Sequence, residues 1–484
     1  MKPNQNNKTV ILLTIDALRP DHLPSYGYKL PTAPNLKKFC KYGLKFTNAY
    51  TNGPETPSSF STLFTSTLPY QDGGYSPLPN QKITFPEILS ERKIFTYGIH
   101  GNPNLSRFYN YGRGFDIFLD GQRYKKSKKG EKPSLKHRLL SNIRKSFEFR
   151  DLLKKAMYTV KGINTVKNFI RNRFPGITDF LVPFSPMSYN ASYLTNRIEK
   201  FLREKSNRPT FLWAHFMDVH SPYNPPMSNI KNLTEKEITL QDKDLINSKI
   251  YPNPKKYKIT DEISQKLETL YDAQINFIDE NLKSFFEMLK RTYDKNCLVV
   301  ITADHGEALL DHYNTGHQGF IYNELLKIPL IFVELGNESK IKYFDKPVQM
   351  LDIAPTILDY FDIEPPDYFR GQSLLPLLKG KKIESSKLII SETYQKGGIV
   401  KRNNKEGYKI VSIIDGDFKY IYDEEKNHES LYNLKKDKGE KRNILSENEE
   451  IASRFRLLLS THLEEVRKNN EKSKIRSAIH KIKI

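Results

Sequence analysis

The chain has 484 residues, of which 38% are hydrophobic, and this is enough to bury one large core and a smaller second one. No stretch approaches the roughly 20 apolar residues that a membrane-spanning helix needs. The polar start runs directly into an apolar segment, so we expect a protein that is neither secreted nor membrane-spanning. Its two cysteines, Cys40 and Cys297, stand in apolar runs, which argues against a disulfide framework or thiolate zinc site and favours a cytoplasmic location.

The net charge of +21 is concentrated in one part of the chain. Residues 121–175 hold 17 Lys and Arg against 3 Asp and Glu, a difference of 14. One interpretation is a solvated insertion. The other is a pair of basic amphipathic helices that contact an anionic membrane surface, because apolar positions recur among the cations. Aromatic residues are not interleaved there as stacking platforms, which argues against nucleic acid as a partner.

In chain order, apolar runs alternate with helical patterns. Residues 8–15 read as a strand buried on both faces, and the same form recurs at 211–218, 297–304 and 328–335. Between them, 190–204, 264–291 and 352–361 have helical periodicity. This alternation predicts an α/β fold with a doubly wound, mostly parallel sheet. Asp16, Asp218 and Asp304 end three of the strands, where ligands bind in such sheets.

The pattern changes near residue 385, where short strands separated by turns precede a helix expected at about 447–468. We therefore expect a catalytic domain over 8–384, with the basic insertion at about 121–185. A small C-terminal antiparallel α+β subdomain is expected over 385–470, followed by a loosely held basic tail over 471–484.

Two segments carry candidate chemistry. In ADHGEALLDHYNTGH (303–317), Asp304 and His305 directly follow a strand, and carboxylate with imidazole suits a divalent ion such as Mn, Zn, Mg or Ca. For this pair alone, a structural hydrogen bond is the commoner explanation, but Asp16 at another strand end favours a metal. In GPETPSSFSTLFTS (53–66), hydroxyls precede a probable helix whose free N–H groups favour an anion. An ordinary Ser/Thr-rich helix cap is the alternative.

Taken together, these segments resemble the sulfatase family of the alkaline phosphatase superfamily. The motifs that carry the resemblance, in family order, are TIDALRPDHLPSYGY, TPSSFSTLFTS, HFMDVHSPY, ADHGEALLDH with GHQG, LDIAPTILDYF with GQSLLPLL, and FKYIYD with LYNL. The resemblance runs nearly end to end. It implies an α/β fold with a C-terminal subdomain, a divalent metal, and attack on a sulfate or phosphate ester by a metal-bound residue.

The nucleophile departs from the sulfatase pattern, in which Cys or Ser of Cys-x-Pro-Ser-Arg is oxidised to formylglycine. Aligning LFTS with the end of that motif places Thr56 there, whereas aligning on Pro57 places Glu55. We take Thr56, as in related phosphoester-cleaving members that use an unmodified threonine. Ala17 also replaces a second aspartate, and Ile99 replaces a sulfate-binding lysine. These departures favour a phosphate ester and a phosphothreonine intermediate.

The resemblance assigns Asp16, Thr56, Asp304 and His305 to one metal, which would acidify Thr56. Arg19, His220 and His317 are expected to contact substrate, and His220 to protonate the leaving alcohol. Alternatives remain open. For Arg19, the alternative is that it only braces its loop. For His220, the alternative is a second metal site formed with Asp218, His312 and His317.

The resulting prediction is a metal-dependent hydrolase or transferase, similar to phosphoglycerol transferases, that cleaves a phosphate ester through a covalent Thr56 intermediate. Its partner would be an anionic ester, such as a glycan or lipid head group, with peripheral membrane contact through 121–175. Two alternatives remain. One is a true sulfuric ester hydrolase, and the other is an inactive module that binds anionic lipid or polysaccharide.

Overall fold

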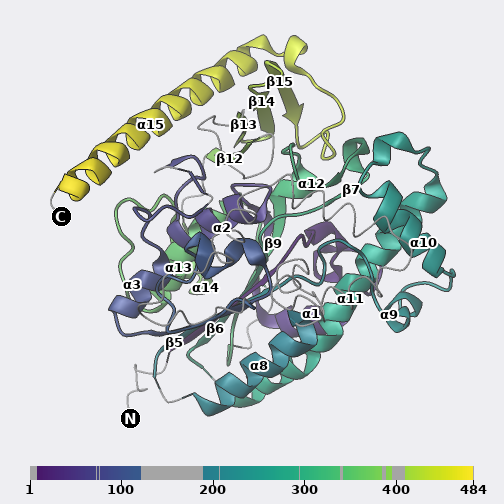
Figure 1. The fold of residues 1–484 in the computed structure, drawn as a ribbon, viewed down its shortest axis with the longest axis horizontal. Helices are drawn as coiled ribbons and strands as arrows, with labels where there is room; N and C mark the ends of the chain where they lie inside the picture. Colours follow the sequence, from purple (N-terminus) through teal and green to yellow (C-terminus); the bar gives the residue numbers. More distant parts are fainter. Residues whose placement is uncertain are drawn as a thin grey trace, which may run out of the picture. The chain divides into compact units, whose positions relative to one another are not determined.

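The structure is a computed structural model (Figure 1). It describes residues 8–71, 74–75, 77–121, 189–205, 208–293, 295–337, 342–383, 388–394 and 409–482, with the side chains of the last segment described to residue 471. Nearly all of the basic insertion expected at 121–185 lies outside the described residues, so the proposed amphipathic helix pair stays a prediction.

A nine-stranded sheet with the order β10-β2-β9-β6-β1-β5-β3-β4 forms the centre of the fold, and β11 pairs with β2. Its members are β1 (Thr9–Ile15), β2 (Leu44–Tyr50), β3 (Phe95–His100), β4 (Ile117–Leu119), β5 (Thr210–Phe216), β6 (Cys297–Ala303), β9 (Lys327–Glu334), β10 (Lys342–Phe344) and β11 (Val348–Gln349). Among the described strands of this central sheet, only β9 runs antiparallel to both of its neighbours. The predicted doubly wound, mostly parallel α/β sheet is confirmed.

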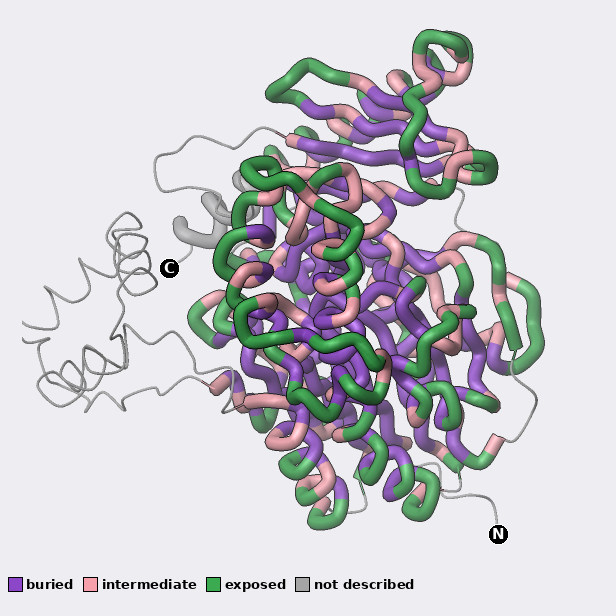
Figure 2. The backbone as a smooth tube through the Cα atoms, turned by 90° about the vertical axis from the view of Figure 1, so that its right-hand side faces the viewer, coloured by how far each residue is buried: buried purple, intermediate pink, exposed green. Residues whose placement is uncertain are grey.

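Helices cover both faces of this sheet (Figure 1). On one face lie α1 (Pro34–Phe39), α8 (Ala191–Glu204) and α11 (Asp261–Thr292), and on the other lie α2 (Thr56–Thr65), α3 (Phe85–Glu91), α13 (Ile353–Tyr360) and α14 (Leu375–Leu378). These helices pack on the sheet through an apolar face. In α8, for example, the buried Leu194, Ile198 and Leu202 recur at a spacing of four residues and form one apolar stripe. Every residue of β1, β5 and β6 is buried, as Figure 2 shows for the centre of the molecule.

Short elements connect the larger ones. They are α9 (Met227–Lys231), α10 (Leu240–Leu245), α12 (Asn323–Leu326), and the two-stranded sheet of β7 (Ala308–Leu309) and β8 (Thr315–Gly316). In the described part of the chain, no helix is both long and apolar enough to cross a membrane.

The C-terminal region is a four-stranded antiparallel sheet with a long helix. Its strands are β12 (Leu388–Tyr394), β13 (Lys409–Asp415), β14 (Phe418–Asp423) and β15 (His428–Asn433), which pair in chain order. The predicted antiparallel sheet is confirmed. The helix α15 (Glu449–Ile482) starts near the expected position but continues through most of the segment expected to be a loose tail.

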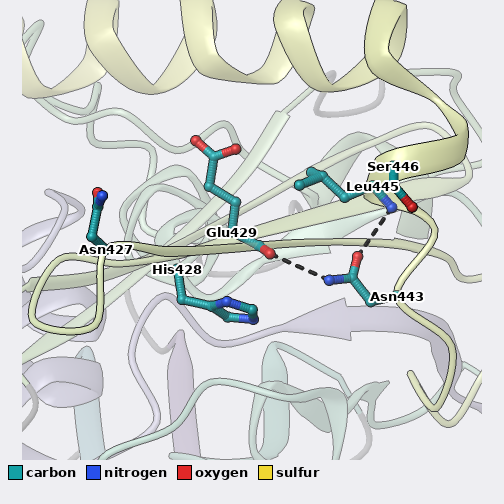
Figure 3. Close-up of a pocket in the computed structure, with 6 residues that line it drawn as sticks. All are labelled: Asn427, His428, Glu429, Asn443, Leu445 and Ser446. Carbon is teal, nitrogen blue, oxygen red and sulfur yellow. Dashed lines mark hydrogen bonds between the residues drawn. The ribbon is translucent and has the colours of Figure 1, made fainter.

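A pocket of about 410 Å³ lies where β15 meets the chain that leads into α15 (Figure 3). Asn443 crosses it: its Oδ1 accepts the N–H groups of Leu431 and Leu445, and its Nδ2 donates to the carbonyl of Glu429. The side-chain amide of Asn443 is thus hydrogen-bonded to the backbone around it. We therefore interpret this pocket as a structural feature that is separate from the strand ends described next.

Candidate active site

The register of the central strands brings the chemistry-bearing residues to one edge of the sheet. Ile15, the last residue of β1, pairs with Phe216 of β5 on one side and with Ala303 of β6 on the other. Asp16 and Asp304 follow directly, so both carboxylates lie at the carboxyl ends of parallel strands. His215, one residue before the end of β5, pairs with Thr14 and completes the row.

Each of the two carboxylates has one occupied oxygen and one oxygen without a hydrogen-bond partner. Asp304 Oδ1 accepts the backbone N–H groups of Ala17 (3.2 Å) and His305 (3.0 Å), while Asp304 Oδ2 has none. Asp16 Oδ2 accepts Asn102 Nδ2–H at 3.2 Å, while Asp16 Oδ1 has none. Both side chains are fully buried, so these bare oxygens require a partner that the protein itself does not supply.

His305 adds a nitrogen to the same point. Its Nδ1–H donates to the Gly306 carbonyl at 2.8 Å, which leaves Nε2 as the acceptor of a neutral ring. That Nε2 lies 3.4 Å from Asp304 Oδ2 and 3.8 Å from Asp16 Oδ1. We call Asp16, Asp304, His305 and His215 the strand-edge cluster.

The electrostatics of the cluster suit a bound cation. Burial and then the charge of Asp16 raise the pKa of Asp304 to about 7. Burial would also raise the pKa of Asp16, but the imidazoles of His220, His215 and His305 lower it well below its usual range. Burial and the neighbouring His317 lower the pKa of His305 to about 3. Without a cation, one of the two carboxylates therefore holds a proton, and the His305 ring is neutral.

These properties fit a divalent metal. Asp16, His215 and Asp304 each offer one ligand atom, and the three atoms lie within 4.8 Å of one another. Carboxylate oxygens with neutral imidazole nitrogen suit zinc or manganese and accept other divalent ions. Asp16 Oδ1, Asp304 Oδ2 and His215 Nε2, which have no hydrogen-bond partner, would hold it together with His305 Nε2. The role of Asp16, Asp304 and His305 as ligands, predicted from sequence, stays a prediction that this geometry favours.

Thr56 lies beside this cluster, as its assignment requires. It is the first residue of α2, and its Oγ1 is 3.4 Å from His305 Nε2. Glu55 faces a different set of partners: its side chain accepts the backbone N–H of Ser58 as the helix cap, and also accepts the Thr393 hydroxyl at 3.0 Å. Of the two alignments, the one that assigns Thr56 therefore places a hydroxyl next to the strand-edge cluster.

Two further histidine rings, those of His317 and His220, continue the row of imidazoles next to His305. The ring centroid of His317 is 4.2 Å from that of His305 and 5.2 Å from that of His220. His220 Nδ1–H donates to the Ser221 carbonyl at 2.6 Å, which leaves its Nε2 for another partner. Burial would lower the pKa of His317, but Glu307, whose Oε1 lies 3.3 Å from its Nδ1, raises it to about 9. His317 is thus cationic at neutral pH and can attract an anion.

Arg19 is bound both by Asp21 of its own loop and by the segment that holds Glu307 and Asp311. Its Nε and Nη2 donate to the two carboxylate oxygens of Asp21, and Nη1 donates to Asp311 at 2.6 Å and to the Glu307 carbonyl at 3.0 Å. Four of its five N–H groups are therefore occupied. This arrangement favours the loop-bracing alternative, and the predicted substrate contact remains untested.

Asp218 and His312 have structural partners. Asp218 Oδ1 accepts the N–H of Ala191 in the first turn of α8 at 3.0 Å. His312 Nδ1 lies 2.8 Å from Glu324 Oε1, and its Nε2–H donates to the Glu440 carbonyl at 3.2 Å. Because both ring nitrogens of His312 are occupied, the structure favours its structural role over the second metal site considered from the sequence.

Sequence reasoning missed two residues of the site, His215 and Asn102. A histidine inside an otherwise apolar strand, FLWAHF, was a usable signal, because a fully buried imidazole needs a partner. Asn102 follows the end of β3 and carries no distinguishing pattern. Glu307, the partner of His317, is also fully buried.

An α/β sheet with carboxylates and imidazoles at the carboxyl ends of its central strands is typical of an α/β enzyme that binds its ligand there. Residues 8–363 match the family described as sulfatase, and residues 313–469 match the family described as N-sulphoglucosamine sulphohydrolase, C-terminal. The chain belongs to the sulfatase family, whose members are hydrolases acting on ester bonds.

The similar proteins include, by their names, sulfatases and a phosphonate monoester hydrolase. An arylsulfatase of Clostridium perfringens is 24% identical over 93% of this chain and 91% of its own length. A delta 4,5-hexuronate-2-O-sulfatase of Bacteroides thetaiotaomicron is 30% identical over 37% of this chain and 38% of its own length. The structure of a phosphonate monoester hydrolase of Agrobacterium radiobacter matches with a TM-score of 0.64, 17% identity, and coverage of 96% of both chains.

Proposed function

We propose that this protein is a metal-dependent enzyme that cleaves a phosphate ester through a covalent intermediate on Thr56. One observation supports it most directly: the Thr56 hydroxyl, at the start of α2, lies 3.4 Å from His305 Nε2, beside two carboxylates with bare oxygens. A threonine hydroxyl is a poor nucleophile unless its pKa is lowered. A bound divalent ion would lower that pKa and screen the charge of the ester.

The surrounding side chains supply the remaining steps. Once Thr56 has lost its proton to water, its Oγ1 forms a bond to phosphorus as the bond to the leaving alcohol breaks. His220, protonated on both ring nitrogens in this step, gives the leaving oxygen the proton of its Nε2. His317, held cationic by Glu307, attracts the non-bridging oxygens. Transfer of the phosphoryl group from Thr56 to water gives a hydrolase, and transfer to a hydroxyl gives a transferase similar to phosphoglycerol transferases.

The absence of a convertible residue supports phosphate over sulfate. The chain's two cysteines, Cys40 and Cys297, lie buried in other elements, so neither can supply formylglycine beside the cluster. The serines that follow Thr56 bond back to the helix start: Ser58 Oγ donates to the Glu55 carbonyl and Ser59 Oγ to the Thr56 carbonyl. A sulfated threonine would be hard to turn over, whereas phosphorus accepts a second in-line attack.

A sulfate ester remains the second candidate, supported by the family match and by the arylsulfatase similar over 93% of the chain. For either ester, we propose an anionic glycan or lipid head group as the substrate. The name of the hexuronate sulfatase supports a glycan. A cytoplasmic location with peripheral membrane contact through 121–175 also stays a proposal.

The test is metal-dependent turnover of matched nitrophenyl esters. Purified protein is stripped with a chelator, reloaded with manganese or zinc, and assayed on p-nitrophenyl phosphate, bis-p-nitrophenyl phosphate and p-nitrophenyl sulfate. We expect metal-dependent cleavage of the phosphoesters and loss of turnover in Thr56→Ala. Thr62→Val, a buried hydroxyl six residues further along α2, is the matched control and should stay active. Full activity of Thr56→Ala, or faster sulfate release, would refute the proposal.

A further inference from the structure

The chain that leads into Thr56 is hydrogen-bonded to strand β12 of the C-terminal sheet. Ser391 Oγ donates to the Thr51 carbonyl at 2.7 Å, and the N–H of Glu392 donates to the Asn52 carbonyl at 2.9 Å. Asn52 Nδ2–H donates back to a carbonyl of β12 at 2.8 Å. These four residues have no exposed surface, so water does not compete for the bonds. The position of the segment before Thr56 is therefore set by β12.

Thr393, the next residue of β12, reaches the residue that directly precedes Thr56. Its Oγ1 donates to Glu55 Oε1 at 3.0 Å. The direction is fixed, because a carboxylate only accepts. The other acceptor within reach of this hydroxyl, the Tyr394 carbonyl, is farther away at 3.4 Å, and the shorter bond to a charged group is the stronger one. Thr393 has no exposed surface and Glu55 is only 4% exposed, so the bond is shielded from water.

Glu55 is the residue from which α2 starts. Its backbone is extended, with φ −133° and ψ 151°, and it forms a capping box with Ser58. Thr56 follows as the first residue of the helix, and its Oγ1 lies 3.4 Å from His305 Nε2. Because the cap determines where the first turn begins, a rotation of Glu55 would move Thr56 Oγ1 relative to the strand-edge cluster.

The strand β12 is itself held from its other neighbours. Glu392 Oε2 accepts the N–H of Tyr70 at 2.7 Å, and Glu392 Oε1 lies 2.5 Å from Nε2 of His462, a residue of α15. Tyr70 follows α2 by five residues, so β12 binds the chain both before and after that helix. A strand fixed in this way can hold the cap of α2 in one position.

We infer that Thr393 is a positioning residue for the nucleophile: by binding the Glu55 carboxylate, it fixes the first turn of α2 and keeps Thr56 Oγ1 beside the strand-edge cluster. The C-terminal sheet is then part of the catalytic unit, although the sequence predicted a catalytic domain that ends before it. The inference rests on the proposed function, in which Thr56 is the nucleophile.

The first experiment compares kcat and KM of full-length, manganese-loaded variants on p-nitrophenyl phosphate. Thr393→Val keeps the shape but not the hydroxyl, and its kcat should fall by about 10- to 100-fold, the effect of misplacing a reacting atom by about 1 Å. KM should change little, because no group that contacts the substrate is removed. Thr393→Ser restores the hydroxyl and should recover most of kcat.

Thr96→Val is the matched control, because Thr96 is also buried and its Oγ1 also donates to a carboxylate, that of Asp116, at 3.1 Å. Its kcat should equal that of the wild type. A wild-type kcat in Thr393→Val, or an equal loss in Thr393→Ser, would overturn the inference and leave the proposed function standing. Full activity of Thr56→Ala would refute the proposed function, and the inference with it.

The second experiment has a readout that does not depend on turnover. Amide hydrogen exchange over residues 51–59, followed by mass spectrometry, should be faster in Thr393→Val than in the wild type and unchanged in Thr96→Val. Unchanged exchange, or faster exchange with a wild-type kcat, would overturn the positioning role. If Thr393→Val does not fold, as judged by circular dichroism, Glu55→Gln and Glu55→Ala decide. Glu55→Gln keeps an acceptor for Thr393 and should lose less of kcat, and equal losses in these two variants would overturn the inference.

Discussion

Two groups of buried charges in this protein differ in how their charge is compensated. The strand-edge cluster holds Asp16 and Asp304, whose side chains have no exposed surface. The C-terminal pair, which we define as Lys419 and Glu440, is equally buried. Burial of an uncompensated charge costs several kcal/mol in either place.

The C-terminal pair is compensated within the protein. Lys419 Nζ lies 2.7 Å from Glu440 Oε1 and donates to Asn323 Oδ1 at 3.1 Å, while Glu440 Oε2 accepts the Asn323 N–H at 2.6 Å. The strand-edge cluster instead combines two carboxylates with the neutral imidazole of His305, and one oxygen of each carboxylate has no hydrogen-bond partner. The difference indicates that the C-terminal pair serves stability, whereas the strand-edge cluster is suited to bind a cation.

The largest expected effect is loss of function from neutralising one strand-edge carboxylate. Asp304→Asn removes a charged ligand, so we expect turnover and metal affinity to fall by at least about 100-fold. The metal-free variant should melt no lower than the metal-free wild type, because repulsion with Asp16 is relieved. Calorimetry with and without zinc measures the metal affinity and the melting temperature. A large loss of stability in the metal-free variant would contradict the comparison.

Breaking the C-terminal pair should have the opposite effect, namely a loss of stability without a loss of turnover. Lys419→Met leaves Glu440 buried and unpaired, and we expect the free energy of unfolding to fall by about 3–5 kcal/mol. Turnover per folded molecule should be nearly unchanged. Urea denaturation measures the stability.

The double variant Lys419→Met/Glu440→Gln is the control for that prediction. It removes both charges and should recover most of the loss, because replacing a whole buried pair is often neutral. A double variant as unstable as the single one would show that packing, and not charge, causes the effect.

A pH titration of stability sharpens the contrast. In the metal-free protein, burial and Asp16 raise the pKa of Asp304 to about 7, above its unfolded value of 3.8. Between these values the folded state holds a proton that the unfolded state has lost, so stability should fall as pH rises from about 4 to about 7, by a few kcal/mol in all.

Other buried acids also titrate there: burial raises the pKa of Asp218, Asp279 and Asp352 to about 6. The quantity to measure is therefore the difference in unfolding free energy between wild type and Asp304→Asn, which cancels these shared terms. Saturating zinc, which takes the place of the proton, should abolish this pH dependence. A difference that is flat with pH in the metal-free proteins would contradict the shift.

Features of this protein that depend on local sequence patterns could be predicted, whereas contacts between residues far apart in the chain could not. Apolar runs that end in Asp16 and Asp304 could be recognised because a buried parallel strand and its ligand-bearing end are local patterns. The part played by His215 could not, because its partner Thr14 is 201 residues away. The partners of Arg19 were invisible for the same reason, since Asp311 lies 292 residues from it.

The smallest expected effect is that of replacing Arg19. This variant tests whether Arg19 braces its loop or contacts the substrate. Lys can replace the charge but not the paired hydrogen bonds to Asp21 and Asp311, so Arg19→Lys should lower the unfolding free energy by about 1–3 kcal/mol. KM should stay nearly unchanged if Arg19 only braces its loop. Arg113→Lys is the matched control, because its guanidinium also binds loop carbonyls. A tenfold rise in KM confined to Arg19→Lys, with unchanged stability, would show that the guanidinium reaches the substrate after all.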